Sequence, residues 1–385
     1  MAERVAIVTA SVVTALGDDL VTTFRALMEG RGALAPIRGF EAAPFGDPVA
    51  AQLAARDASV VEDGPTRVET PHGRLLDVTA RRAHDEASFG DLPRDAIGFF
   101  TALPVVDSEP AALAAAVAGS RAATGELDLA VFFDRGFRAI HPLWPLEMLN
   151  NVALGQAAAD LDVRGDNSVF SPEADAGVRA IAEATGAIRR GELRASLAVG
   201  VGEHVSPGAL ARARVRAVPS EVLGEGAGAL ALESESSAAT RGRTPTGFVG
   251  GTGFAFDRSP LGPGPSSAAI VRAVRNALSD AGRSTDDVAL LVIEGIGAEE
   301  AAARRELFGQ RATAIAVVAP AVAIGHLRAG AAVVGAALAT AMLAIGRAPS
   351  SAHGRARALA PQGVAVVLAS GSGGQAAALV LEGVR

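Results

Sequence analysis

Two kinds of hydrophobic pattern follow each other along this chain: short, continuous apolar runs and longer segments with helical spacing. Short apolar runs bounded by turn residues are typical of buried strands, and apolar residues three and four positions apart are typical of one helix face. The strand patterns lie at 4–17 (ending in a turn), 96–101, 195–205, 224–233, 288–297 and 363–382, the last as two strands around a glycine-rich turn. The helix patterns lie at 19–30, 74–88, 103–120, 176–190, 266–281 and 326–347. The chain is therefore predicted to mix strands and helices throughout.

The segment 167–191 carries the most informative local pattern. A short strand pattern runs through a sharp turn into a helix whose apolar residues, from Val178 to Ile188, recur at helical spacing. Arg190 lies in the predicted last turn, and Gly191 follows where a left-handed residue ends many helices. Such an elbow presents one side chain at the amino end of a buried helix, where the helix dipole favours an anion.

This elbow resembles the nucleophile elbow of the β-ketoacyl synthases, in the thiolase-like superfamily. There a cysteine precedes small residues, a glycine and an apolar helix that ends in Arg-Arg-Gly. On that pattern Gly177 is the glycine and Ala174 stands in place of the cysteine, and alanine cannot attack a thioester. The segment is closer still to chain length factors, the non-catalytic ketosynthase-like subunits of type II polyketide synthases. In those the cysteine is commonly a glutamine preceded by glutamate, and this chain keeps the glutamate as Glu173.

The same resemblance implies further losses at the site. Ketosynthases carry a first catalytic histidine after a strand, and here Ile296 occupies that position, two residues after Glu294. The second histidine is kept as His326 in an Ile-Gly-His segment, but Ala321 replaces the lysine expected before it. Ser372 stands where a phenylalanine gates the cysteine pocket. A lone histidine at a helix start is more often structural than catalytic, so we expect no catalytic residue.

These combined losses favour a naturally inactive subunit, a chain length factor or ketosynthase β subunit. An engineered exchange of cysteine for alanine would explain Ala174 alone. An enzyme remains the alternative: a malonyl-carrier-protein decarboxylase or an acyltransferase with a degenerate ketosynthase site, to which an acyl-serine mechanism with Ser171 and His326 would belong. A homodimeric binding protein that kept only the fold is a third possibility.

The resemblance covers nearly the whole chain and implies the thiolase-like fold. This is an α/β fold, internally duplicated in five layers of helix and sheet (αβαβα). We expect an amino-terminal half at residues 1–240 and a carboxy-terminal half at 241–385. The glycines of the segment 224–228 fit the family pattern and allow a tight backbone turn before a strand.

Composition narrows the chemistry further. The chain has 385 residues, no cysteine and a net charge of −7, which excludes disulfides, thiolate metal sites and a cysteine nucleophile, and argues against nucleic acid as a partner. The histidines lack metal-ligand spacing, and the glycine stretches match neither a P-loop nor a dinucleotide fingerprint. We therefore expect no metal and no cofactor. The amino terminus lacks a long apolar run after a basic region, so we expect no signal peptide and a cytoplasmic protein.

The run 329–346 is uncharged and long enough to cross a membrane. Glycine and alanine dominate it, no aromatic belt flanks it, and amphipathic elements lie on both sides. These features favour a fully buried core helix, so we expect no membrane contact.

The only tryptophan, Trp144, lies in a segment that also holds Phe132, Phe133 and Phe137. Aromatic residues make up 4% of the chain, so this cluster predicts either core packing or an interface anchor. The resemblance implies a heterodimer with an active ketosynthase α subunit. It also implies an acyl carrier protein that brings the growing chain on phosphopantetheine.

Small residues recur on the helix predicted near Pro110. Ser108, Ala111, Ala112 and Ala115 are spaced so that they can share one face. In chain length factors the corresponding helix lends side chains to the floor of the partner's acyl tunnel. By resemblance, small residues there imply a deep tunnel and a long product. The alternative is ordinary close packing of an alanine-rich helix.

Overall fold

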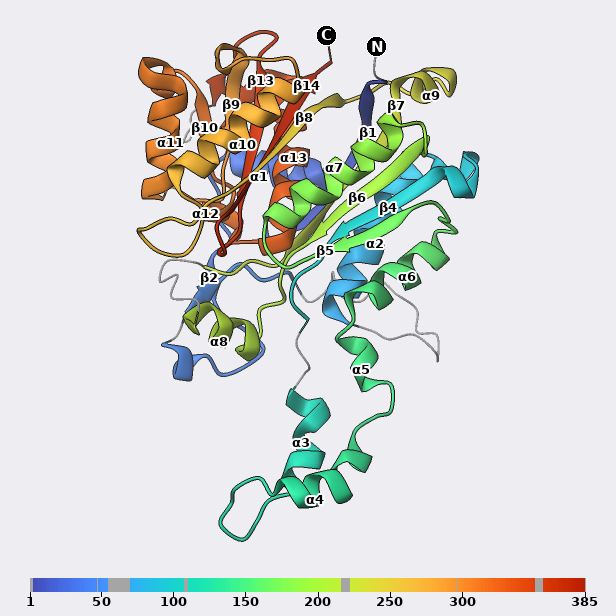
Figure 1. Ribbon diagram of the computed structural model, residues 1–385, viewed down its shortest axis with the longest axis vertical. Helices are drawn as coiled ribbons and strands as arrows, with labels where there is room; N and C mark the ends of the chain where they lie inside the picture. Colours follow the sequence, from blue (N-terminus) through green and yellow to red (C-terminus); the bar gives the residue numbers. More distant parts are fainter. Residues whose placement is uncertain are drawn as a thin grey trace.

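The computed structural model describes residues 3–46, 48–54, 70–106, 110–215, 222–295, 297–349 and 356–384, with the backbone alone for 110–112. Ten strands form one sheet in the order β10-β9-β13-β14-β8-β1-β7-β6-β4-β5 (Figure 1). They are β1 (Val5–Thr14), β4 (Ile97–Ala102), β5 (Asn167–Phe170), β6 (Ala195–Val201), β7 (Gly226–Ser234), β8 (Gly247–Phe256), β9 (Val288–Val292), β10 (Ala316–Val318), β13 (Val364–Ser370) and β14 (Gln375–Gly383). Two short ribbons pair β2 (Ala35–Pro36) with β3 (Val49–Ala50) and β11 (Arg347–Ala348) with β12 (Arg357–Ala358).

The helices are α1 (Leu20–Met28), α2 (Pro71–Glu86), α3 (Pro110–Ala118), α4 (Leu129–Asp134), α5 (Trp144–Glu147), α6 (Asn150–Asp160), α7 (Asp175–Arg189), α8 (Pro207–Val215), α9 (Glu235–Thr240), α10 (Ser267–Asp280), α11 (Ala298–Phe308), α12 (Ala321–Ile324) and α13 (Ala331–Ile345). Their ends follow local chemistry. The side chains of Asp19, Thr70 and Ser266 accept hydrogen bonds from backbone N–H groups in the first turns of α1, α2 and α10. Gly191, at φ +75°, follows α7 as the sequence predicts.

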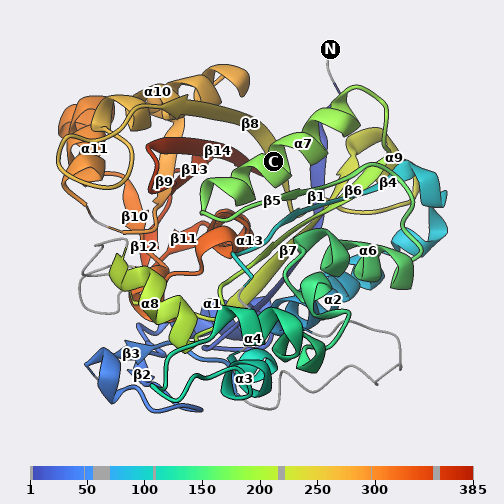
Figure 2. The same cartoon turned by 60° about the horizontal axis from the view of Figure 1, so that its bottom comes forward.

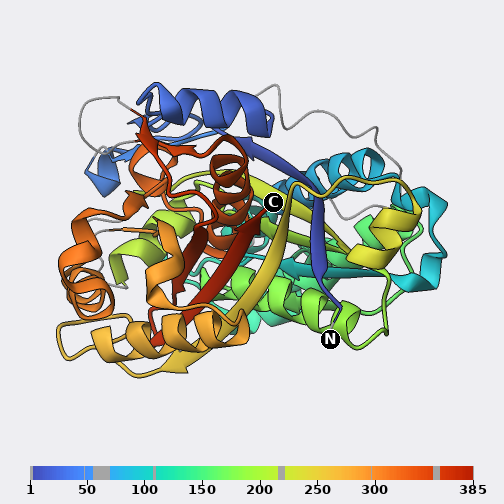
Figure 3. The same ribbon diagram turned by 90° about the horizontal axis from the view of Figure 1, so that it is seen from above.

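The sheet repeats one topology twice. In the first set β4, β5 and β6 are parallel, and β7 and β1 continue the sheet antiparallel. In the second set β9, β10 and β13 are parallel, and β14 and β8 continue it antiparallel. β1 joins the sets, because it pairs with β7 along its length and with β8 through Val5–Ile7. Figure 3 shows the first and last strands, dark blue and red, on either side of yellow β8 in the middle of the sheet.

Helices divide the molecule into five layers, which confirms the predicted α/β fold class. α7 and α13 lie between the two sets of strands and contact both (Figure 2). α2 and α6 cover the outer face of the first set, and α10 and α11 cover that of the second. The predicted division at residue 240 coincides with the end of α9, between the two sets, and it stays a proposal.

The most apolar helix of the described residues is α13. The window Arg328–Ile345 is long and apolar enough to cross a membrane, but 72% of it is buried inside the protein, as expected of a core helix. The prediction that this helix starts at residue 326 is wrong. His326 forms a β-bridge with Leu223, and Arg328 has a φ of +48°, so regular helix begins only at Ala331.

Helices α3, α4 and α5 project away from the layered body (Figure 1). We call residues 110–149 the arm. The side chains of Phe133 and Phe137 on the arm are 72% and 55% exposed, so the core alternative does not hold for these two residues. Phe132 is half-buried against Phe133, with ring centroids 5.4 Å apart and nearly perpendicular planes.

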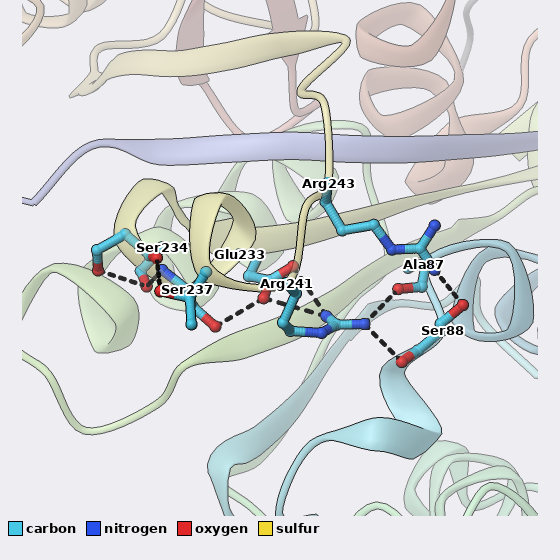
Figure 4. Close-up of polar contacts among 9 residues, drawn as sticks. Ala87, Ser88, Glu233, Ser234, Ser237, Arg241 and Arg243 are labelled. Carbon is cyan, nitrogen blue, oxygen red and sulfur yellow. Dashed lines mark hydrogen bonds and ion pairs between the residues drawn. The ribbon is translucent and has the colours of Figure 1, made fainter.

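A buried ion pair fastens the end of α2 to the edge of β7 (Figure 4). Glu233 is fully buried, and its two carboxylate oxygens accept hydrogen bonds from Arg241 Nη1 at 3.0 and 3.1 Å. Arg241 Nη2 donates to the carbonyl oxygens of Ala87 and Ser88 at 2.8 and 2.6 Å. A polar cavity of ≈ 930 Å³ adjoins this pair, but Arg241 is committed to Glu233 and the two carbonyl groups. We therefore regard this region as structural.

Candidate functional site

Segments from both halves of the molecule meet at one end of the sheet. β9, β10 and β13 are parallel, so the residues that follow them gather at the same edge. Glu294 follows β9, His326 follows β10 after α12, and Ser372 follows β13. The elbow after β5 brings Glu173 to this edge from the other half, at the amino end of α7.

A cavity of ≈ 520 Å³ opens where these segments meet. Its wall includes Glu173, Glu294, His326 and Ser372, so the structure brings together residues that the resemblance assigns to one site. The wall also includes a proline- and glycine-rich loop over 259–265 and the amino end of α11.

The remaining predicted positions lie at or beside this cavity. Ala174 is the N-cap residue of α7 and is 2% exposed, and it is not part of the cavity wall although its neighbour Glu173 is. Ala321 lines a small adjoining void of ≈ 20 Å³ together with Glu294 and His326. Ile296 lies outside the described residues. The catalytic roles lost at these positions stay predictions.

Sequence reasoning missed Arg328, which lies at the centre of the site. Its side chain is 7% exposed and forms ion pairs with Glu173 (Nη1 to Oε2, 3.7 Å) and with Glu203 (Nε to Oε2, 3.8 Å). Ser372 Oγ donates a hydrogen bond to the other oxygen of Glu173 at 3.2 Å. Glu203 also pairs with Arg212. The available signal was a single charged residue directly before the long apolar run.

His326 is held by its backbone and is neutral near pH 7. Its N–H donates to the Val222 carbonyl oxygen at 2.7 Å, and its own carbonyl oxygen accepts from Gly224 N at 3.0 Å. Burial is the main cause that lowers the pKa of His326 to about 4, and the nearby positive charge of Arg328 contributes to the same shift. A neutral imidazole can still accept or donate one hydrogen bond, but the described wall offers it no activated nucleophile to serve.

Ser171 is not brought together with His326. Its Oγ accepts a hydrogen bond from Asn150 Nδ2 at 3.3 Å and donates to the Pro104 carbonyl oxygen at 3.4 Å. The cavity that His326 lines does not include Ser171. An acyl-serine mechanism with this pair therefore finds no support in the geometry.

The predicted tunnel and interface residues lie on the arm or just before it. Ser108 lies outside the described residues, and Ala111 and Ala112 belong to the part of α3 whose backbone alone is described. Ala115 on the same helix is exposed, and Trp144 at the start of α5 is half-buried. Their roles stay predictions, because no partner chain is present to define what faces them.

Comparison with known structures identifies the fold. The whole chain superposes on "The ishigamide ketosynthase/chain length factor" with a TM-score of 0.83, 23% identity and 100% of both chains covered. It superposes on a β-ketoacyl synthase from Burkholderia phymatum STM815 with a TM-score of 0.81 and 20% identity, again over 100% of both chains. Residues 247–355 match the family profile "Beta-ketoacyl synthase, C-terminal domain". These likenesses show that the chain has the fold of the ketosynthase-like proteins.

Further proteins that are similar to this chain carry the names of enzymes or complexes. "3-oxoacyl-[acyl-carrier-protein] synthase 2" of Staphylococcus aureus (strain N315) is 25% identical over 358 residues, covering 84% of this chain and 82% of the relative. The synthase of the same name from Synechocystis sp. is 24% identical over 356 residues, covering 85% and 82%. A third structure, described as "AntDE:AntF (apo): type II PKS acyl-carrier protein in complex with its ketosynthase bound to the hexaketide", superposes over 100% of both chains with a TM-score of 0.81 and 17% identity.

Proposed function

We propose that this thiolase-like protein is a chain length factor, a non-catalytic subunit that pairs with an active ketosynthase and shapes its acyl tunnel. It would thereby set chain length in type II polyketide or polyene biosynthesis. One observation carries the proposal: the elbow keeps its geometry, but alanine stands at its tip and an arginine–glutamate ion pair stands beside it. A site without a nucleophile, in a fold that forms large dimers, has its remaining use in supporting a partner.

The arm supports the same proposal. Phe133 and Phe137 expose large apolar surfaces, and exposed apolar surface of this kind commonly marks a protein interface. We propose that Phe132, Phe133, Phe137 and Trp144 anchor a heterodimer with a ketosynthase α subunit. The partner would receive the growing chain from an acyl carrier protein on phosphopantetheine, in the cytoplasm.

Co-expression with a ketosynthase encoded beside this chain tests the pairing directly. We expect a stable heterodimer by light scattering, and we expect this chain alone to retain no label from radiolabelled acyl-carrier protein. A well-behaved homodimer that refuses the partner would count against the proposal.

The tunnel role has its own test on α3. Ala115 is exposed in this chain, so a phenylalanine there meets no packed core of its own subunit. We expect Ala115→Phe to shorten the products of the reconstituted pair without dissolving it, because the ring fills space that the acyl chain would occupy. Ala114→Phe, also exposed but turned about 100° around the helix, is the matched control. Unchanged product length with an intact complex would remove this helix from the tunnel.

A second function is favoured by the open cavity of ≈ 520 Å³ with His326 in its wall. That cavity would suit a malonyl-carrier-protein decarboxylase or an acyltransferase with a degenerate site. Release of CO₂ from malonyl-carrier protein by the isolated chain, abolished in His326→Ala, would replace the chain length factor by this enzyme. We expect no release above the blank.

A further inference from the structure

Charged side chains line the cavity of the candidate site next to the elbow, and the residue at the elbow tip does not. Glu173 and Arg328 both line the cavity, whereas Ala174, which follows Glu173 directly, does not. Ala174 is only 2% exposed, so its methyl group is covered although the cavity beside it is open.

Arg328 reaches this position across the two halves of the molecule. Its two carboxylate partners come from the first half, Glu173 from the elbow and Glu203 from the turn after β6. Arg328 comes from the second half, in a left-handed backbone conformation directly before α13. Removing one member of this group of buried charges is costly, because it leaves another buried charge uncompensated.

Neighbouring groups fix the ion pair in place. Ser372 Oγ donates to Glu173 Oε1, so the carboxylate is held from the β13–β14 turn as well. His326 lines the same cavity as Arg328, and its pKa is lowered mainly by burial and to a lesser extent by the Arg328 charge. The guanidinium thus lines the same cavity as Glu173, His326 and Ser372, which the resemblance assigns to the ketosynthase site.

We propose that the Arg328–Glu173 ion pair seals position 174, so that an acyl thioester could not reach the elbow even if a nucleophile stood there. This inference rests on the proposed non-catalytic function and deepens it. The site would then lack a nucleophile and would also be closed to the substrate. We call the Arg328–Glu173 ion pair that closes it the plug.

The absence of cysteine from the chain gives a direct measurement. In Ala174→Cys the only thiol lies at the elbow tip, and its alkylation by iodoacetamide reports access. We expect it to react about tenfold or more slowly than the thiol of Ala114→Cys on the exposed face of α3. In Ala174→Cys with Arg328→Leu, we expect the rate to rise about tenfold.

Replacing Arg328 should change the thiolate fraction and the accessibility of the thiol in opposite directions. Removing a nearby arginine raises the pKa of a thiol and so lowers its thiolate fraction. A faster reaction in the Arg328→Leu background therefore reports access and not activation. Ala184→Cys, at a fully buried position of the same helix, must stay unlabelled in that background, which rules out general unfolding.

If Arg328→Leu unfolds the chain, Glu173→Ala decides the question, because it opens one side of the plug while Arg328 keeps Glu203. Loss of this carboxylate would itself raise the thiolate fraction, so the rates are compared on the alkaline plateau, where the thiol is fully ionised with and without Glu173. Either of two results would overturn the seal. One is an equal alkylation rate in Ala174→Cys and Ala114→Cys. The other is an unchanged alkylation rate at position 174 when Arg328 or Glu173 is replaced in a chain that stays folded. Either result would leave the pairing and product-length tests untouched, so the two proposals fail separately.

Discussion

Apolar and charged side chains are covered or paired in the layered body, whereas large apolar side chains are exposed on the arm. In the body, apolar helices such as α13 are enclosed between strands, and buried charges such as Glu233 have close partners. On the arm, Phe133 and Phe137 face outward with few neighbours in their own chain. Buried apolar area is the main source of stability. Substitution of a buried side chain should therefore change the free energy of unfolding more than substitution of an exposed one. The body therefore explains why this chain folds, and the exposed arm is where we propose that a partner binds.

The largest effect should come from breaking the buried ion pair of the body. Glu233→Gln leaves Arg241 charged in a nearly closed site, so we expect the free energy of unfolding to fall by about 3–5 kcal/mol. Chemical denaturation measures the change. Glu235→Gln is the control, because its pair with Arg4 is exposed and should contribute about 0–1 kcal/mol. Equal losses in the two variants would contradict the contrast.

Acid should weaken the body through its buried histidines. Burial lowers the pKa of His326 and His72 from 6.5 to about 4, so the unfolded chain binds protons first as pH falls. The stabilisation is complete above pH 6.5 and decreases between pH 6.5 and 4, by up to about 3 kcal/mol for each histidine. Denaturation at pH 7 and pH 4.5 measures the loss. His326→Gln should remove about half of this dependence and leave the share of His72, whereas substitution of exposed His141 should leave it as it is.

A smaller loss is expected where the two central helices touch. A Cβ at Gly177 would lie 2.8 Å from Ala332 Cβ and 3.1 Å from the Ala329 carbonyl oxygen. Gly177→Ala should therefore push α7 away from α13 and destabilise the chain by about 1–3 kcal/mol. In Gly186→Ala the added carbon meets only the flexible end of Arg190, so better helix propensity should stabilise by up to about 1 kcal/mol. Thermal unfolding that fails to separate these two variants would refute the close contact.

The smallest effect on stability should come from the arm, together with the largest effect on association. We expect Phe133→Ser combined with Phe137→Ser to change the free energy of unfolding by less than about 0.5 kcal/mol, because both side chains are exposed. The same variant should fail to co-purify with the ketosynthase partner. A stable pair containing this double variant would show that the interface lies elsewhere.

Most of the layered body could be predicted from hydrophobic pattern and resemblance. The elbow, its helix and Gly191 follow local rules of periodicity and capping, which depend on neighbouring residues alone. The start of α13 could not be predicted in this way. The bridge between His326 and Leu223 joins residues about a hundred positions apart, and that tertiary contact overrides the helical pattern that the sequence carries there.

The position of the candidate site was predicted from the sequence, but not all of the residues that form it. Alignment of motifs indicated where Glu173, His326 and Ser372 would meet, because parallel strands bring their ends together. The role of Arg328 depends on a left-handed backbone and on carboxylates from two distant segments, so no local pattern marks it. The orientation of the aromatic cluster was open for a similar reason, since exposure on an arm is decided by how the helices leave the body.

The enclosure of α13 has a consequence for folding during synthesis. Its window has a mean hydropathy of 1.7, and two of the strands that cover it, β13 and β14, are synthesised after it. The earlier strands β6 and β7 can shelter one side of the helix, but the other side waits for Gln375–Gly383. Domains generally fold as units during synthesis. Until β13 and β14 have left the ribosome, α13 therefore lacks cover on one face, and this exposed apolar surface should make the incomplete chain prone to aggregation.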